Sequence, residues 1–168
     1  MVGNCLLLSR NDLCRCRGAE RGAAAQPTST RSDAPERSSA RESGVSALKP
    51  LCGIEPYLFE NLQTFCVQTI AAQTQLLFGI ASSIDPAVSV VRKLQEAYPE
   101  QNIERVVDAK VHGTNLKVSN LINLEAHIRH AVVVLADSDI AVDPHYLENV
   151  TAPLAHADNG IVTCLYDA

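Results

Sequence analysis

Two kinds of hydrophobic pattern alternate along residues 45–168. Short apolar and β-branched runs, typical of buried strands, are separated by stretches in which apolar positions recur every three or four residues, typical of amphipathic helices. The expected strands are residues 45–48, 75–81, 103–107, 132–136 and 161–164, and the expected helices are residues 56–66, 85–98, 115–130 and 143–152. This alternation predicts an α/β fold with a mostly parallel sheet.

Local features set the expected boundaries of these elements. Lys49 and Pro50 follow the first apolar run, so we expect the first strand to end there in a turn. Asp85 followed by Pro86 is typical of a helix start, because aspartate caps a helix and proline suits its first position. The helix expected over residues 115–130 has one mostly apolar face that we expect to be buried, made of Val118, Leu121, Ile122, Glu125 and Ile128.

Residues 1–44 differ in composition from the rest of the chain. They contain seven arginines and five acidic residues but no aromatic residue, and almost no large apolar side chain after position 17. Such a segment cannot offset the entropy lost on ordering by burying apolar surface. We therefore expect residues 1–44 to be a disordered tail and residues 45–168 to form the folded domain.

Composition also limits the classes of function. The formal net charge of −5 is the opposite of what a nucleic-acid-binding surface requires, and no apolar run approaches the ~18 residues of a membrane-spanning helix. The cysteines and histidines lack the spacing of a zinc site, and we expect the cysteines to be reduced thiols. Glycine-rich nucleotide-binding motifs and the nucleophile motif of serine hydrolases are also absent from the sequence, and no protein partner is evident.

Two aspartates follow the most apolar of the expected strands. Asp137 and Asp139 come directly after residues 132–136, which are typical of a central strand covered on both faces. Ligands of parallel sheets bind at the carboxyl ends of the strands. Because Mg²⁺ and Mn²⁺ prefer carboxylates together with substrate phosphate oxygens, this pair predicts a site for a divalent cation and a phosphate. The alternative interpretation is a solvated loop that happens to contain two aspartates.

A second candidate site precedes the helix expected at residue 115. The sequence from His112 to Lys117 places Gly113, Asn115 and Lys117 at a helix N-terminus, where backbone N–H groups favour anions. The alternative interpretation is a helix start with incidental polar residues.

Four ordered blocks over residues 45–165 resemble a known family. They are Lys49-Pro50-Leu51-x-Gly53-x-Glu55-Pro56 with Glu60-Asn61-Leu62, Asp85-Pro86-Ala87, His112-Gly113-Thr114-Asn115-x-Lys117-Val118-Ser119-Asn120-Leu121-Ile122-Asn123, and Ala136-Asp137-Ser138-Asp139-Ile140 with Pro144-x-Tyr146-Leu147. Together they resemble the ceramide glucosyltransferase family, the GT-A-type family 21 of glycosyltransferases. The third block is most similar to the bacterial hopanoid-biosynthesis-associated branch.

The resemblance implies a Rossmann-like GT-A domain that moves glucose or a related sugar from a UDP-sugar to a membrane lipid, such as ceramide or a hopanoid-pathway lipid. It implies Mg²⁺ or Mn²⁺ as cofactor. Carried over by position, Asp137 would contact the ribose, and Asp139, with Asp137 beside it, would hold the metal on the diphosphate. Asn115 and Lys117 would flank the nucleotide-sugar. The end of the strand over residues 75–81, followed by Ser82 and Asp85, would hold the uracil.

The sequence departs from the family pattern in two respects. Ser82 stands where the family has an aspartate, and Asp85 belongs to the neighbouring Asp-Pro-Ala block. The later acidic residue that would act as general base, and a Gln/Arg-x-x-Arg-Trp motif, have no counterpart in a sequence without tryptophan. We therefore expect the nucleotide-sugar-binding half of an incomplete domain, inactive by itself.

Two other interpretations stay open. One is a non-catalytic α/β module that binds a nucleotide or metal weakly, and the other is a phosphate-binding domain unrelated to sugars. The family resemblance implies a cytosolic catalytic face on a protein anchored by membrane helices. Because no such helix is evident here, we expect this chain to be cytoplasmic.

Overall fold

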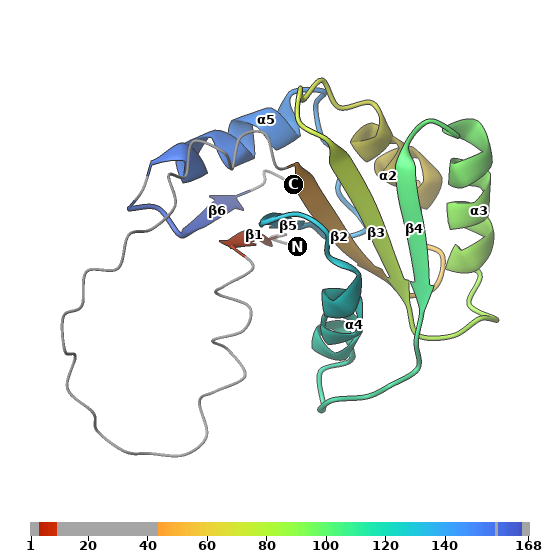
Figure 1. The fold of residues 1–168 in the computed structure, drawn as a ribbon. Coiled ribbons are helices and arrows are strands. Elements are labelled where there is room, and N and C mark those ends of the chain that lie inside the picture. Colours follow the sequence, from red (N-terminus) through yellow and green to blue (C-terminus); the bar gives the residue numbers. More distant parts are fainter. Residues whose placement is uncertain (1–3, 10–43, 157, 166–168) are drawn as a thin grey trace, which may run out of the picture.

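A six-stranded sheet forms the centre of the molecule (Figure 1). The computed structural model describes residues 4–9, 44–156 and 158–165. The strands are β1 (Asn4–Ser9), β2 (Val45–Leu51), β3 (Thr74–Ile80), β4 (Asn102–Val107), β5 (Val132–Leu135) and β6 (Ile161–Leu165), in the spatial order β4-β3-β2-β5-β1-β6. β2, β3, β4 and β5 are parallel, whereas β1 runs antiparallel to β5 and β6. The predicted α/β fold with a mostly parallel sheet is confirmed.

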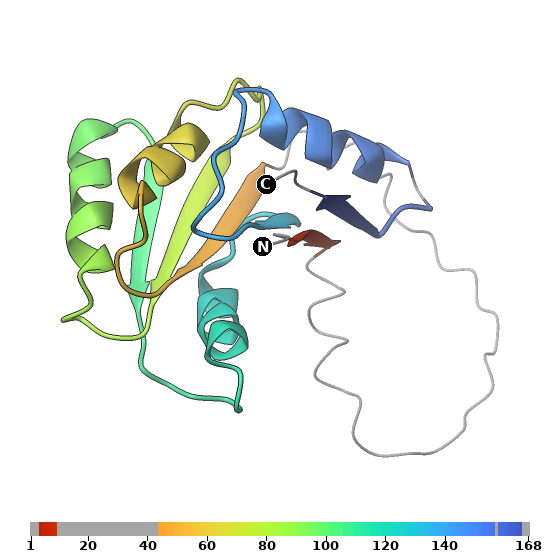
Figure 2. The same cartoon turned by 180° about the vertical axis from the view of Figure 1, so that it is seen from behind.

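Helices cover both faces of this sheet. They are α2 (Leu58–Cys66), α3 (Ala87–Ala97), α4 (Leu116–Leu124) and α5 (Tyr146–Thr151), with the short 3₁₀ helices η3 (Glu125–His127) and η4 (Ala152–Ala155). α2, α3 and α5 lie on one side of the sheet and α4 lies on the other (Figures 1 and 2). None of the helices in the described residues is long and apolar enough to cross a membrane.

Alternate residues of the central strands supply two cores. Val45, Ala47 and Leu51 of β2 pack with α2, α3 and α5, whereas Leu48 packs with Leu124 of α4 on the opposite face. Side chains of a strand alternate between the two faces of a sheet, so a strand covered on both sides must be apolar at nearly every position. This explains the continuous apolar runs in the sequence.

A strand near the start of the chain lies where we expected disorder. β1 pairs with β5 between Leu6–Leu135 and Ser9–Val132, and pairs with β6 on its other side. The prediction of a disordered tail is therefore wrong for residues 4–9, while residues 1–3 and 10–43 lie outside the described residues. The physical reason is that β5 would otherwise present unpaired N–H and C=O groups at its outer edge, which an added strand satisfies.

The first predicted strand continues beyond its expected end. β2 pairs with β3 as far as Leu51, opposite Ile80, so the expected turn at Lys49 and Pro50 is wrong. Pairing with β5 ends at Leu48, and proline is tolerated where a strand has lost one neighbour because proline has no N–H to donate. Lys49 is consequently inside the sheet and only 1% exposed.

The face of α4 that packs on the sheet also differs from the predicted one. Leu124 is buried, and so is Ile128 just beyond the helix, but Val118 is 46% exposed. Asn120 is buried instead, because its amide donates a hydrogen bond of 2.9 Å to the carbonyl of Gly79 in β3. A polar contact between helix and strand therefore sets the rotation of α4, which hydrophobic periodicity does not report.

Candidate functional site

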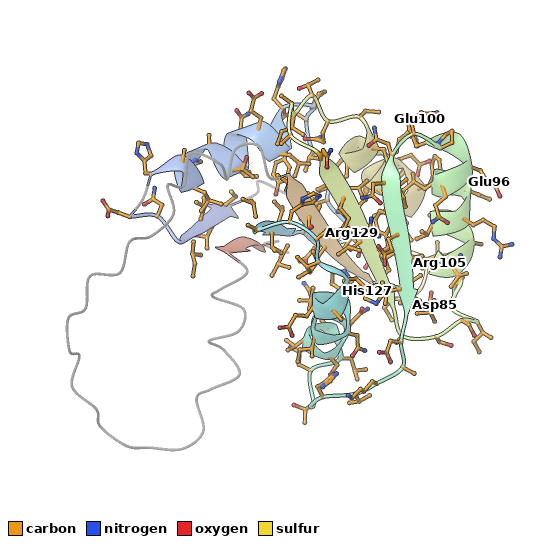
Figure 3. The ribbon with its side chains drawn as sticks, in the orientation of Figure 1. Asp85, Glu96, Glu100, Arg105, His127 and Arg129 are labelled. Atoms are coloured by element: carbon orange, nitrogen blue, oxygen red, sulfur yellow. The ribbon has the colours of Figure 1, made fainter. Side chains whose placement is uncertain are left out.

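The loops that follow the four parallel strands meet at one end of the sheet. Ser82 and Asp85 lie after β3, Lys117 lies in the first turn of α4 after β4, and Asp137 and Asp139 lie after β5. Figure 3 shows Asp85 at this carboxyl end, with Glu100 at the opposite end of β4. The sheet thus brings residues from distant parts of the sequence to the edge where ligands of parallel sheets bind.

Asp137 is held by two lysines. Its carboxylate forms an ion pair with Lys117 Nζ, and its backbone carbonyl accepts a hydrogen bond of 2.6 Å from Lys49 Nζ. The side chain of Asp137 is 27% exposed and that of Lys117 is 54% exposed, so their ion pair lies at the surface. The structure thus brings Asp137 and Lys117, two of the candidate site residues, into direct contact.

Asp139 differs from Asp137 in its surroundings. It is exposed, and its carboxylate has no hydrogen-bond or ion-pair partner in the part of the chain that the structure describes. Between them, Ser138 Oγ donates a hydrogen bond of 2.7 Å to Glu55 Oε2 in the loop after β2. The turn after β5 is therefore anchored at Asp137 and Ser138 and presents Asp139 to solvent.

The start of α4 is held by hydrogen bonds within the β4–α4 segment. Asn115 caps the helix, with its side-chain oxygen accepting from the N–H of Val118 at 3.2 Å. Ser119 Oγ accepts from the N–H of His112 at 3.0 Å, and the amide of Asn123 donates to the carbonyl of Lys110 at 3.0 Å. These contacts fix the loop that carries Asn115, so its oxygen acts as a helix cap.

Ser82 and Asp85 occupy different environments after β3. Ser82 is exposed, and its carbonyl accepts from the N–H of Asp85 at 3.1 Å. The carboxylate of Asp85 accepts from the N–H of Gly53 at 3.0 and 3.1 Å and from the N–H of Ala87 at 2.9 Å. Asp85 therefore joins the loop after β2 to the start of α3, and among the described residues no hydrogen bond or ion pair links Asp85 or Ser82 to Asp137.

Three residues that shape this site were given no role by the sequence motifs. Lys49 and Glu55 stand in the first motif block and reach the turn after β5 through Asp137 and Ser138. The backbone N–H of Gly53 donates to the carboxylate of Asp85. Gly53 has a backbone φ of +72°, a conformation that favours glycine. A lysine inside a mostly apolar run is the feature of the sequence that could have pointed to Lys49.

The carboxylates at this edge fit a cation that a ligand helps to coordinate. No group of three or more His, Cys, Asp or Glu side chains in residues 4–9, 44–156 and 158–165 is placed to hold a metal ion. Mg²⁺ in phosphate-transfer sites is commonly held by one or two carboxylates plus phosphate oxygens and water. Asp139, with Asp137 two residues away, matches that donor set.

Comparisons with known proteins identify relatives of the chain. Residues 17–168 match the model of glycosyl transferase family 21. Ceramide glucosyltransferase 1 of Caenorhabditis elegans is 31% identical over 121 residues, covering 71% of this chain and 26% of that protein. Ceramide glucosyltransferase of Candida albicans is 26% identical over 117 residues, covering 63% of this chain and 22% of that protein. The chain spans about a quarter of the length of these curated relatives.

Solved structures share the fold. The mannosyltransferase PcManGT from Pyrobaculum calidifontis, in complex with GDP-Man and Mn²⁺, has a TM-score of 0.55 at 22% identity, over 67% of this chain and 32% of that chain. S. aureus TarS 1–349, in complex with UDP-GlcNAc, has a TM-score of 0.51 at 18% identity, over 64% of this chain and 30% of that chain. The predicted GT-A fold is confirmed.

Proposed function

The chain belongs to glycosyl transferase family 21, and on that premise we propose that residues 45–168 bind the UDP-sugar donor of a hexosyl transfer to a membrane lipid. The observation that carries this proposal is the exposed carboxylate of Asp139, which has no partner among the described residues and follows the Asp137–Lys117 ion pair at the carboxyl ends of the parallel strands. The curated relatives named ceramide glucosyltransferase support glucose as the sugar and ceramide as the lipid. A hopanoid-pathway lipid is the other acceptor that the sequence predicts.

Asp139, with Asp137 beside it, would hold Mg²⁺ or Mn²⁺ together with oxygens of the diphosphate. When bound, the cation offsets the negative charge that develops on the diphosphate as the sugar leaves. The mannosyltransferase PcManGT, solved in complex with GDP-Man and Mn²⁺, supports this pairing of nucleotide-sugar and cation. The chain itself contributes an exposed carboxylate on an anchored turn, so little ordering is required when the cation binds.

Lys117 and Asp137 would separate when the donor binds. In the structure their charges neutralise each other at the surface. A diphosphate carries more negative charge than one carboxylate, so Lys117 would turn to it and leave Asp137 free to accept a hydrogen bond from a ribose hydroxyl. Asn115, whose side-chain oxygen already caps α4, would offer its amide N–H group to the ligand.

Ser82 and Asp85 would contribute unequally to uracil binding. The Asp85 carboxylate already accepts hydrogen bonds from two backbone N–H groups, which leaves it a structural role at the edge of the uracil site. Ser82 is exposed and carries a neutral hydroxyl where the family has a carboxylate. We therefore expect the nucleotide to bind weakly, held mainly through its diphosphate and cation.

We further propose that this 168-residue chain binds the donor without transferring the sugar. The acidic general base and the Arg-Trp motif implied by the family resemblance have no counterpart in its sequence. A general base typically contributes ~10²–10⁴ in rate, and acceptor positioning contributes more.

Calorimetric titration of UDP with Mn²⁺ into the wild-type chain, Asp139→Ala and Asp158→Ala tests donor binding. Asp158 is an exposed aspartate before β6, away from the carboxyl ends, and serves as the matched control. We expect Asp139→Ala to weaken binding by about tenfold or more and Asp158→Ala to leave it unchanged, since a hydrogen bond or coordination to a charged group contributes about 1.5–3 kcal/mol. Equal affinity in all three proteins would remove Asp139 from the cation site.

A parallel assay with radiolabelled UDP-glucose and either ceramide or a hopanoid-pathway lipid measures transfer. We expect no glycolipid product from this chain alone. Product with one lipid would overturn the proposed inactivity and identify the acceptor. Absence of UDP binding by the wild-type chain, with or without Mn²⁺, would instead favour a module with no donor site.

A further inference from the structure

Lys49 is a charged side chain inside the core. It is 1% exposed, and the other residues of β2 on its face, Val45, Ala47 and Leu51, are apolar. Its Nζ lies 3.8 Å from the centroid of the Phe65 ring in α2 and donates a hydrogen bond of 2.6 Å to the backbone carbonyl of Asp137. The side chain therefore reaches from the middle of the sheet to the first residue of the turn after β5.

Stability alone does not explain a lysine at this position. Taking an ammonium group out of water is costly, and replacing buried charges by apolar side chains of similar volume is often neutral or stabilising. The Phe65 ring and the carbonyl of Asp137 help to offset that cost. An apolar side chain would fill the same space without this desolvation cost. The ammonium group is therefore better explained by its hydrogen bond to the carbonyl of Asp137.

We propose that Lys49 is a positioning residue for the donor site, which rests on the proposed function above. By binding the carbonyl of Asp137, Lys49 fixes the main chain at the start of the turn from inside the core. Ser138 is fixed separately through Glu55. With both residues anchored, the carboxylate of Asp139 is held out toward the cation and diphosphate of the donor.

The two lysines at Asp137 thus have different roles. Lys117 is 54% exposed, pairs with the carboxylate and can exchange it for a diphosphate. Lys49 is enclosed and binds the carbonyl, so we expect it to keep that contact when a ligand binds. Lys49 therefore acts on the donor only through the turn, without touching it.

The test compares Lys49→Met, Lys49→Arg and Ser46→Ala with the wild-type chain. Methionine keeps the length and packing of the lysine stem but cannot donate to Asp137, whereas arginine keeps a charged donor. Ser46 is a buried residue of the same strand whose hydroxyl donates to Gln75 at 2.7 Å on the opposite face, so its removal tests a loss of buried polar contact away from the turn. Circular dichroism establishes that each variant is folded.

Two quantities are measured for each folded variant: amide hydrogen exchange of residues 137–140 without ligand, and the affinity for UDP with Mn²⁺. Lys49→Met should exchange faster in this turn and bind UDP with Mn²⁺ about tenfold more weakly, as expected for a lost hydrogen bond to a charged group. Lys49→Arg should show smaller changes than Lys49→Met in both the amide exchange and the affinity. Ser46→Ala should have the exchange rates and affinity of the wild-type chain.

The outcomes distinguish this proposal from the proposed function. If the wild-type chain binds UDP with Mn²⁺ and Lys49→Met binds it equally well, the positioning role is overturned and the donor site stands. Unchanged exchange of residues 137–140 in Lys49→Met overturns it as well. If the wild-type chain does not bind the donor, both proposals fail, and faster exchange in Lys49→Met then leaves Lys49 a purely structural anchor of the turn.

Discussion

The two ends of the parallel sheet use similar side chains in opposite ways. At the amino end, Gln75 is fully buried and accepts from Ser46 Oγ at 2.7 Å and from the N–H of Arg129 at 3.1 Å. Its amide donates to Glu104, whose carboxylate also contacts His127 Nδ1 at 2.6 Å. At the carboxyl end, Asp139 is exposed and unpartnered within the described residues.

This difference separates polar groups that are paired within the protein from polar groups that are open to solvent. Buried polar groups must be paired within the protein, because leaving one unpaired costs free energy. The amino end satisfies this requirement with side chains that join β2, β3 and β4 to the segment before β5. The carboxyl end leaves donors and acceptors available, which is stable only because water, or a ligand, can reach them. Substitutions at the two ends should therefore affect different measurements.

The largest effect on stability should come from Gln75→Ala at the amino end. The substitution removes four hydrogen bonds and leaves buried partners unpaired, so we expect the free energy of unfolding to fall by about 3 kcal/mol. Urea denaturation measures it. Gln95→Ala is the matched control, because Gln95 makes one hydrogen bond, to Ile103, and should cost about 1 kcal/mol or less. Weaker UDP binding by folded Gln75→Ala would contradict the separation of the two ends.

Gly79→Ala should lower both stability and donor binding. A Cβ at this position would overlap the side chain of Asn120, which forces α4 away from β3. We expect a loss of about 2 kcal/mol in the free energy of unfolding, typical of overpacking, and weaker binding of UDP with Mn²⁺ because α4 carries Lys117. Gly113→Ala, where nothing lies within 4 Å of the added Cβ, should change neither quantity. The double variant Gly79→Ala/Asn120→Ala should lose less free energy of unfolding than the two single variants together. Additive losses would show that the destabilisation does not come from the overlap with Asn120.

The pH dependence of the free energy of unfolding should differ between a buried thiol, Cys66, and an exposed one, Cys52. Burial raises the pKa of the Cys66 thiol from 9.0 to about 12. The unfolded chain therefore loses this proton near pH 9, while the folded chain retains it. The free energy of unfolding is then unaffected by this group below pH 9 and falls as the pH rises toward 12, by at most about 1.4 kcal/mol per pH unit.

Urea denaturation of the wild-type chain, Cys66→Ala and Cys52→Ala at pH 8 and pH 10 measures this contribution. Cys66→Ala should show a smaller loss of stability between the two pH values than the wild type. Cys52 is exposed in the loop after β2, and Cys52→Ala should keep the wild-type difference. Identical pH dependence in all three proteins would show that Cys66 is accessible to water.

The smallest change in stability should follow Lys117→Met. The ion pair with Asp137 lies at the surface, and such pairs contribute about 0.5 kcal/mol or less. Binding of UDP with Mn²⁺ should nevertheless weaken about tenfold, because a charge-assisted contact to the diphosphate is lost. Lys93→Met, an exposed lysine of α3, is the control and should bind as the wild type does. If Lys117→Met is strongly destabilised but binds UDP with Mn²⁺ as the wild type does, the ion pair stabilises the fold and Lys117 does not bind the diphosphate.

Hydrophobic periodicity was sufficient for most of the fold. The strands β3, β4, β5 and β6 and the helices α2 and α3 begin and end within a few residues of the predicted bounds. Periodicity depends on how successive side chains alternate around one local axis, so it can be seen in the chain before any tertiary contact exists. The order of apolar strands and amphipathic helices then placed the loop with Asp137 and Asp139 at the carboxyl ends of the strands. Family membership was accessible in the same way, from motif blocks in their order.

Other features depended on contacts between residues far apart in the sequence. Lys49 was expected in a turn, and its burial follows from the pairing of β2 with β3 beyond Leu48 and from the position of Phe65. The carboxylate of Asp85, which was expected near the nucleotide, accepts a hydrogen bond from the N–H of Gly53, 32 residues away. The addition of β1 to the edge of β5 joins residues more than a hundred positions apart. The local sequence pattern indicates which side chains avoid water. Strand partners, ion pairs and hydrogen bonds between distant residues form only when the sheet brings the strand ends together.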